Sequence, residues 1–207
     1  MIYIMESDTY TTIKSPSQGI YKEKGSRFTA FTFPLTSAEE VKPIVDKIRK
    51  ENHDAKHHCY AYMIGLERNI WRYNDDGEPS GTAGRPILGQ INSFGLTNVL
   101  IVVSRHFGGT LLGVSGLINA YKTAAASAIE NSEIIERTLQ DFYKVTFSYV
   151  AINDVMKILK EENVSQSDQL FDLDCSIKIN FRASSKERIL NRLSRIEGLK
   201  LEYIETR

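Results

Sequence analysis

Cysteine is scarce in this chain of 207 residues, with only Cys59 and Cys175 present. Small secreted domains compensate for a limited core with several disulfides, so this composition excludes a disulfide-stapled scaffold. Two free thiols in a reducing compartment are the simplest account, and we therefore expect a cytoplasmic protein. A disulfide between the two cysteines remains the alternative.

The sequence also lacks any apolar run that approaches the length of a membrane span. Met1–Met5 is apolar but short, is followed by acidic residues and has no basic leader, so we expect neither a secretory signal nor membrane association. An excess of one charge is missing too, because 26 basic and 26 acidic residues give a formal net charge of zero. Any nucleic-acid binding must therefore come from a local basic patch.

The most informative stretch is an apolar strand that leads into a glycine-rich loop and then a helix. Val99–Val103 has no polar alternation, which predicts a strand buried on both faces. Four glycines follow between residues 108 and 116, and apolar residues from Val114 to Ile129 recur at helical spacing. Free N–H groups and the helix dipole at such a junction suit an anion, although the loop is neither a Walker A motif nor a dinucleotide fingerprint. The alternative is that the glycines only permit tight turns and close helix-to-sheet packing.

A second loop, from Asn74 to Pro86, is rich in Asn, Asp, Gly and Pro, which predicts a series of turns. It leads into a helix whose start is marked by Ser80 or Thr82. A capping box at Ser37–Glu40 predicts a helix that ends near residue 52, and residues 57–64 alternate as a strand with His58 and Tyr60 on one face. The other elements expected in this half are an extended lead-in over residues 1–18, one or two strands within 19–33, and a strand at 70–73.

The apolar pattern breaks between Glu133 and Asp141, and we place a boundary there between a domain of residues 1–137 and a domain of residues 138–207. Beyond the break the periodicities predict the order βαββαβ, a ferredoxin-like plan with both helices on one face of an antiparallel sheet. The outward face of that sheet is expected to be polar and without aromatic residues, which argues against a sequence-reading RRM. Its expected members are Lys144, Thr146, Ser148, Ser176, Lys178, Asn180 and Arg182.

Three motifs in one order resemble the YigZ/Impact family: His58–Ala61, then Asp76–Gly84 followed by Pro86, then Arg105–Gly109 with Leu112-Gly113. The resemblance covers nearly the whole chain and implies an α+β protein. Its N-terminal domain would have the fold of domain 2 of ribosomal protein S5, and its C-terminal ferredoxin-like domain would be similar to domains of the ribosomal translocase. One departure is His106, which stands where the family usually has an aromatic residue; an imidazole can stack much as a tyrosine ring does.

The same resemblance implies a role in translation. Eukaryotic Impact members are implicated in translational control through a ribosome-associated partner, and bacterial members have been proposed to bind nucleic acid. We therefore predict a non-catalytic translation-associated factor that binds RNA, the ribosome or a ribosome-associated protein. Basic side chains would contact phosphates, Phe107 and Tyr60 would stack on bases, and the acidic residues would instead suit a basic protein partner. The predicted surface, centred on the two glycine loops, consists of Lys56, His58, Tyr60, Asp76, Glu78, Arg85, Arg105, His106, Phe107, Gly108 and Gly109.

An enzyme is the alternative: a hydrolase-type activity on a phosphorylated or peptide-like small substrate, with Asp76, Glu78 and His58 as acid–base or metal groups. No nucleophile and base can be paired from the sequence, and no H-x-x-x-H or C-x-x-C spacing is present. We therefore predict no catalytic residue, no metal and no cofactor. The carboxylates, Asp75 included, would then cap turns and the N-terminus of the following helix. The partner's identity and the oligomeric state stay open.

Overall fold

The computed structural model describes residues 8–207, so the prediction about a leader at Met1–Met5 lies outside the described residues. The chain divides into two compact units, one of residues 10–137 and one of residues 138–207 together with Asp8 and Thr9. Both units mix helices and strands, so the predicted α+β class is confirmed. Within residues 8–207, no helix has the length and apolar character that crossing a membrane requires.

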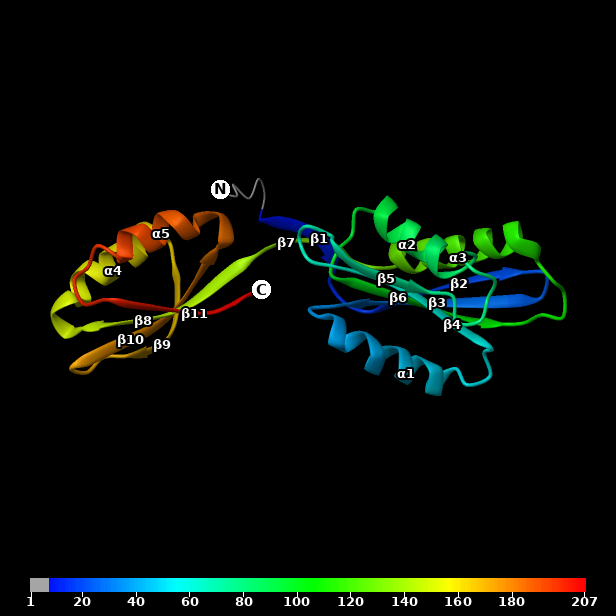
Figure 1. The fold of residues 1–207 in the computed structure, drawn as a ribbon, viewed down its shortest axis with the longest axis horizontal. Coiled ribbons are helices and arrows are strands. Elements are labelled where there is room, and N and C mark those ends of the chain that lie inside the picture. The colour runs from blue at the N-terminus through cyan, green and yellow to red at the C-terminus, as the bar shows by residue number, and fades with distance from the viewer. Residues whose placement is uncertain (1–7) are drawn as a thin grey trace. The chain divides into compact units, whose positions relative to one another are not determined.

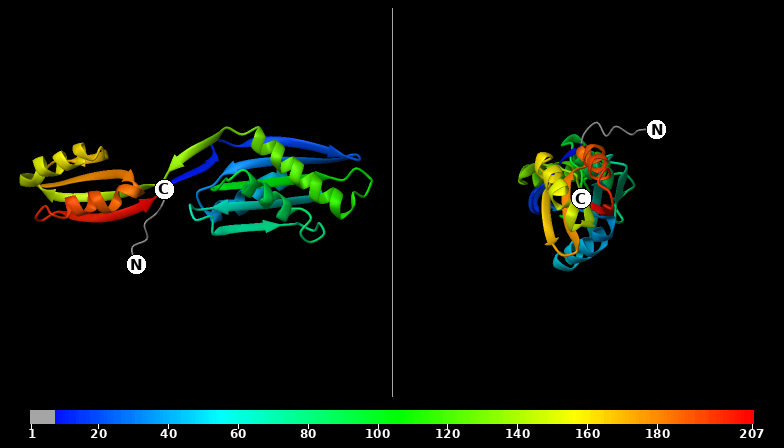
Figure 2. Two further views of the ribbon diagram at one scale, coloured as in Figure 1. Left: turned by 90° about the horizontal axis from the view of Figure 1, so that it is seen from above. Right: turned by 90° about the vertical axis from the view of Figure 1, so that its left-hand side faces the viewer.

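The first unit is built on a five-stranded antiparallel sheet in the order β2-β3-β6-β4-β5. Figure 2 shows these strands side by side. The central strand β6 is buried from Val99 to Arg105 because β3 and β4 flank it and helices cover both faces, which confirms the predicted doubly buried strand. The strands are β2 (Ser17–Glu23), β3 (Ser26–Pro34), β4 (His57–Ile64), β5 (Ile70–Asn74) and β6 (Val99–His106).

Three helices cover this sheet unequally. Helix α1 (Val41–Glu51) lies alone on one face, whereas α2 (Gly84–Ser93) and α3 (Gly113–Glu130) share the other (Figure 1). Alternation along β6 separates the two cores: Val102 packs with α1, and Val103 packs with α2 and α3. The same alternation decides which way each candidate site residue points.

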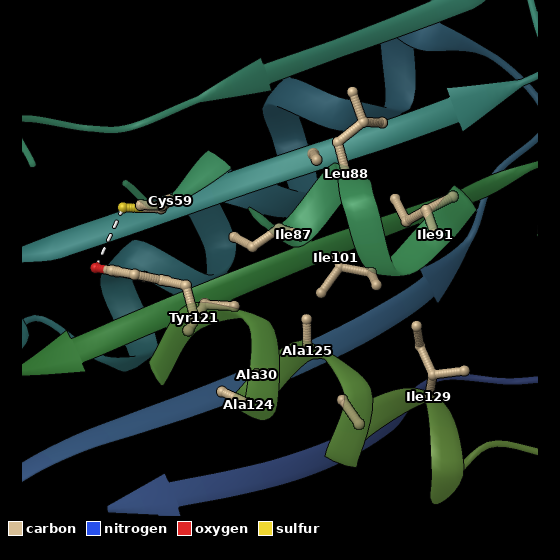
Figure 3. Packing of buried hydrophobic residues seen from close by; sticks show 14 of the residues in the cluster. Ala30, Cys59, Ile87, Leu88, Ile91, Ile101, Tyr121, Ala124, Ala125 and Ile129 are labelled. Atoms are coloured by element: carbon tan, nitrogen blue, oxygen red, sulfur yellow. Dashed lines mark hydrogen bonds between the residues drawn. The ribbon is translucent and has the colours of Figure 1, made fainter. Parts of the chain in front are cut away.

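Small residues bring α3 close to the sheet. Ala124 and Ala125 are fully buried beneath it (Figure 3), and a Cβ added to Gly19 of β2 would lie only 2.3 Å from the backbone N of Ala128. Only glycine fits there. The close helix-to-sheet packing expected from the alanine-rich and glycine-rich sequence is therefore observed.

Two strands of the first half were not predicted. Strands β1 (Thr9–Ile13) and β7 (Ile134–Thr138) form a two-stranded sheet. In its described part, the extended lead-in expected over residues 1–18 consists of strand β1 and the first residues of β2, which begins at Ser17. The stretch where the apolar pattern breaks is itself strand β7. Both strands are rich in polar residues and pair through backbone groups, so they leave no apolar periodicity to read.

The second unit has the element order strand, helix, strand, strand, helix, strand. Its antiparallel sheet has the order β11-β8-β10-β9, and both helices pack on one face over a single apolar cluster. The elements are β8 (Gln140–Ser148), α4 (Ile152–Glu161), β9 (Ser165–Leu170), β10 (Asp174–Arg182), α5 (Lys186–Leu193) and β11 (Lys200–Thr206). Single 3-10 turns precede α1, α4 and α5, at Ala38–Glu40, Tyr149–Ala151 and Ala183–Ser185.

One prediction about the uncovered face of this sheet was wrong. Phe142 lies on it, paired across the sheet with Asn180, and the guanidinium of Arg207 is 4.4 Å from its ring centre. The residue escaped notice because β8 begins at Gln140, earlier than the alternation that starts at Tyr143 indicates.

Candidate functional site

A buried ion pair links the two glycine loops of the first unit. Nη1 of Arg105, near the end of β6, donates to Oε1 of Glu78 at 2.7 Å, and the two side chains are 7% and 3% exposed. The hydroxyl of Tyr121 donates to the same oxygen at 2.8 Å, and Sγ of Cys59 lies 3.4 Å from that hydroxyl (Figure 3). Burial raises the pKa of the Cys59 thiol and of the Tyr121 hydroxyl, so both stay protonated at neutral pH.

Aromatic rings enclose the Arg105 guanidinium. Its central carbon lies 5.4 Å from the ring centre of Phe28 and 5.6 Å from that of Phe107. The ammonium of Lys56, which is exposed, lies 5.7 Å from the Phe107 ring. Arg105 is thus held by Glu78 and by two rings, and Lys56 is the cation that this region presents to solvent.

A hollow of about 410 Å³ opens beside the ion pair, between the end of β6 and the start of α3, and we call it the β6–α3 hollow. Three apolar side chains on its wall face solvent: Phe107 is 43% exposed, Leu111 82% and Val114 59%. Lys56 and His57 also line it. The structure therefore brings Lys56, Glu78, Arg105 and Phe107 of the predicted surface together.

Asp75 acts as a cap. Its carboxylate accepts hydrogen bonds from the backbone N–H groups of Gly81 at 2.9 Å, Ala83 at 3.1 Å and Gly84 at 2.8 Å. Helix α2 accordingly begins at Gly84, two residues after the later of the predicted starts, because Asp75 and not Ser80 or Thr82 satisfies its first N–H groups. The capping alternative holds for this residue.

Asp76 fastens the loop to the opposite face of the sheet. One carboxylate oxygen accepts from Nη2 of Arg49 at 3.0 Å, and the other accepts from the backbone N–H of His58 at 2.7 Å. The His58 ring is buried and donates from Nε2 to the carbonyl of Asn52 at 3.1 Å; burial lowers its pKa, so the neutral ring is favoured. Both side chains are therefore committed to internal contacts.

The eleven predicted residues do not form one surface. His58 and Tyr60 point toward α1, whereas Arg105 and Glu78 point toward α3, because alternate residues of a strand face opposite sides of the sheet. His106 also lies on the α1 side, with Nε2 3.0 Å from a carboxylate oxygen of Asp54. The prediction of a single surface is corrected on this point, and Arg85 lies apart from both groups, exposed in the first turn of α2.

The predicted surface includes His58 but not its neighbour His57. His57 pairs in register with Arg105 across β4 and β6 and lines the β6–α3 hollow, with Nδ1 2.8 Å from the carbonyl oxygen of Asp76. Its alternation with Cys59 was visible in the sequence, but the register between β4 and β6 was not. Without that register, His58 could not be told from His57 as the neighbour of Arg105.

Gly108 has a structural role. A Cβ at this position would lie 1.9 Å from the carbonyl carbon of Gly25, in the turn between β2 and β3. Its neighbour Gly109 has φ +86°, a value that residues with a side chain rarely adopt. The packing explanation therefore accounts for Gly108, and the turn explanation accounts for Gly109.

A second hollow, of about 340 Å³, lies on the α1 side of the sheet, and we call it the α1–β5 groove. Tyr60 and Tyr62 of β4 line it from the same strand face, and Asp76 lines it as well. Three cations that the sequence analysis did not select also line it. The sequence pattern that could have indicated them is the helical spacing of polar residues on α1 and the single basic residue among the aromatic and apolar residues of β5. The three cations are Lys42, Arg49 and Arg72.

Known proteins resemble this chain over different lengths. The Impact N-terminal domain matches residues 24–129. The IMPACT family member YvyE of Bacillus subtilis (strain 168) is 31% identical over 186 residues, which covers 90% of this chain and 84% of that protein. Protein IMPACT of Oryctolagus cuniculus is 36% identical over 96 residues, 44% of this chain and 30% of that protein. A crystal structure of a hypothetical protein aligns with a TM-score of 0.71 at 26% identity, covering 96% of this chain and 98% of that one.

Proposed function

Since this chain belongs to the IMPACT family, we propose that it is a non-catalytic factor in translation or its regulation that binds a ribosome-associated protein in the cytoplasm. The β6–α3 hollow is the proposed contact. The family resemblance implies the role in translation, and the match to the rabbit protein spans 30% of that protein's length. The partner is therefore argued from the chemistry of this chain.

The exposed apolar wall of the hollow is the observation that carries the proposal. Phe107, Leu111 and Val114 present large apolar surfaces around a concave site, and such patches are typical of protein contacts. Against RNA, the Arg105 guanidinium already donates to Glu78, so its charge is largely neutralised. A phosphate backbone would find Lys56 as the only exposed cation among the described residues that line the hollow.

We also propose the finer identities of the two units. The first, residues 10–137, is taken as a domain like domain 2 of ribosomal protein S5, and the second, which holds residues 138–207, as a ferredoxin-like domain. The strand order β11-β8-β10-β9 and the placement of α4 and α5 on one face support the second assignment. Because a shared fold does not imply a shared function, these assignments add no weight to the proposed partner.

Co-sedimentation of the purified chain with ribosomes that retain their associated proteins, and with salt-washed ribosomes that have lost them, tests the proposal. We expect binding to the unwashed particles that persists at high salt and that Leu111→Asp reduces at least tenfold, because a charge would be placed in an apolar contact. Leu173→Asp, at an 86% exposed position of the second unit, is the matched control and should bind normally. Lys56→Gln should change little.

The opposite pattern would contradict a protein contact. Equal binding to washed particles, lost with rising salt and with Lys56→Gln but unchanged in Leu111→Asp, would assign the hollow to RNA. No binding to either preparation would reject the proposal as a whole. Arg105→Ala is a poor probe here, since it leaves Glu78 buried without its cation and so mixes folding with binding.

A further inference from the structure

The α1–β5 groove combines aromatic and cationic side chains in a regular frame. Tyr60 and Tyr62 are two residues apart on β4 and therefore stand on one strand face roughly 7 Å from each other. Each has a polar neighbour across the ladder to β5: Asn74 pairs with Tyr60 and Arg72 pairs with Tyr62. The floor of the groove is thus aromatic and its outer wall is polar.

Helix α1 supplies the other wall. Lys42, Asp46 and Arg49 recur at positions i, i+4 and i+7, so they share one helix face, and all three line the groove. The apolar positions of the helix, Val41, Val45 and Ile48, are buried against the sheet. The groove therefore runs between the polar wall of α1 and strand β5.

The charges in the groove favour an anionic ligand. Three cations stand against two carboxylates, and one of these, Asp76, is already occupied by Arg49 and by the backbone N–H of His58. Lys42 and Arg72 have no ion-pair partner among residues 8–207. Two cations are consequently available on opposite walls, with aromatic rings between them.

We propose that the α1–β5 groove binds a nucleoside phosphate, with the base stacked on Tyr60 or Tyr62 and the phosphate held by Lys42 and Arg72. Base–aromatic stacking tolerates every base, and flanking cations track the phosphate, which is the usual chemistry of single-stranded nucleic-acid binding. Asp46 accepts hydrogen bonds from a ribose hydroxyl or an exocyclic amino group. The ligand has two possible sources, a free nucleotide or a nucleotide of single-stranded RNA. The proposal is independent of the β6–α3 hollow, which lies on the other face of the sheet.

The test is fluorescence anisotropy of labelled oligouridylate and oligoadenylate at low salt, with unlabelled AMP, UMP and inorganic phosphate as competitors. We expect Lys42→Gln/Arg72→Gln to weaken oligonucleotide binding at least tenfold and to lower the slope of log affinity against log salt by about 1.4, since two phosphate contacts are lost. The matched control, Lys22→Gln/Lys122→Gln, removes the same charge from exposed positions of β2 and α3 and should bind like the unaltered chain.

The aromatic half of the site needs its own variants, because both tyrosines also pack partly against the core beneath α1. Tyr62→Leu should weaken binding about tenfold, whereas Tyr62→Phe should restore it, and thermal unfolding followed by circular dichroism checks that both are folded. Competition by AMP and UMP that is as strong as competition by unlabelled oligonucleotides would identify a free nucleotide as the ligand. Competition by oligonucleotides alone would identify single-stranded RNA. Both results support the groove.

Three results would overturn the proposal. The first is no binding of any probe at low salt. The second is equal weakening in the Lys22→Gln/Lys122→Gln control, which would mean that overall charge and not the groove attracts the probe. The third is competition by inorganic phosphate as strong as that by AMP, together with full binding by Tyr62→Leu, which would leave no role for a base.

Discussion

The two units differ in how exposed the cationic partners of their buried carboxylates are. In the first unit both partners of the Glu78–Arg105 pair are buried, with side chains 3% and 7% exposed. In the second unit Asp8 is equally buried, but its partner Arg182 is 53% exposed. Asp141 likewise pairs with a half-exposed Lys186. A cation at the surface can turn to water when its partner is removed, and a buried cation cannot.

The same contrast separates the glycines. In the first unit Gly19, Gly84 and Gly108 lie where a Cβ would meet backbone atoms within 3 Å. In the second unit Gly198 has nothing within 4 Å of such a Cβ. The first unit therefore depends on close approaches of its own backbone at these three positions. The second unit follows an ordinary alternation of buried and exposed positions.

Removal of the buried carboxylate should have the largest effect. Glu78→Gln leaves Arg105 charged, buried and without an anion, so we expect the free energy of unfolding of the first unit to fall by about 3 to 5 kcal/mol. Urea unfolding of the full chain measures it, with separate transitions fitted for the two units. The free energy of unfolding should fall less in the double variant Glu78→Leu/Arg105→Met than in Glu78→Gln. A loss below about 1 kcal/mol in Glu78→Gln would mean that water reaches the pair.

The second-largest loss of stability is expected from a side chain placed at Gly108. Gly108→Ala places a Cβ 1.9 Å from the Gly25 carbonyl carbon, where only backbone movement can relieve it, so we expect a loss of about 3 kcal/mol. Gly89→Ala is the control: this exposed position of α2 has open space around its Cβ, and alanine should stabilise the helix by about 0.5 to 1 kcal/mol. Thermal unfolding of both variants compares them. A tolerated Gly108→Ala would show that the turn at Gly25 is free to shift.

Removal of the buried Asp8 carboxylate in the second unit should lower the free energy of unfolding by a smaller amount. The Arg182 guanidinium and the backbone N–H of Ser184, which donate to Asp8, hold the pKa of that carboxyl well below its usual range. Asp8→Asn should therefore cost about 1.5 to 3 kcal/mol at neutral pH. Because the folded carboxyl stays ionised below the pKa of the unfolded one, the difference between the two proteins should be full above about pH 5, decline below about pH 4 and be lost only where the folded carboxyl is protonated as well. Urea unfolding at a series of pH values from 7 down to about 2 measures it; a difference that does not decline at the acid end of this series would exclude the charge as the cause.

The sequence predicts strands whose side chains alternate or form an apolar run, and it does not predict strands that pair mainly through backbone groups. The strict alternation from Cys175 to Phe181 predicts β10 and its buried face, since such a strand meets helices on one side only. The apolar run of β6 and the order of the second unit are predicted equally well. Strands β1 and β7 are not, because their pairing depends on backbone groups of segments more than 100 residues apart.

The candidate site was predicted in its composition but not in its geometry. Glu78, Arg105 and Phe107 were selected for their chemistry, and they do lie together. No pattern of residues in the sequence indicates that Glu78 neutralises Arg105. Nor does any pattern show that β4 and β6 pair in the register that places His57, and not His58, beside Arg105. Register between strands distant in sequence decides which side chains share a surface, and one sequence does not encode it in any short motif.

The smallest effect is expected where the cation of an ion pair reaches solvent and a second cation stays beside the carboxylate when the first is removed. Arg192 donates to Glu162 at 2.7 Å and also contacts Glu161, but its side chain is 35% exposed and Arg188 remains beside Glu162 at 2.9 Å. Arg192→Ala should therefore cost less than about 1 kcal/mol, and less again at high salt, which screens exposed charges. Urea unfolding with and without added sodium chloride measures both. The Glu78→Gln loss should not change with salt, because its charges are shielded from the ions. A loss in Arg192→Ala as large and as insensitive to salt as that one would remove the distinction between the two units.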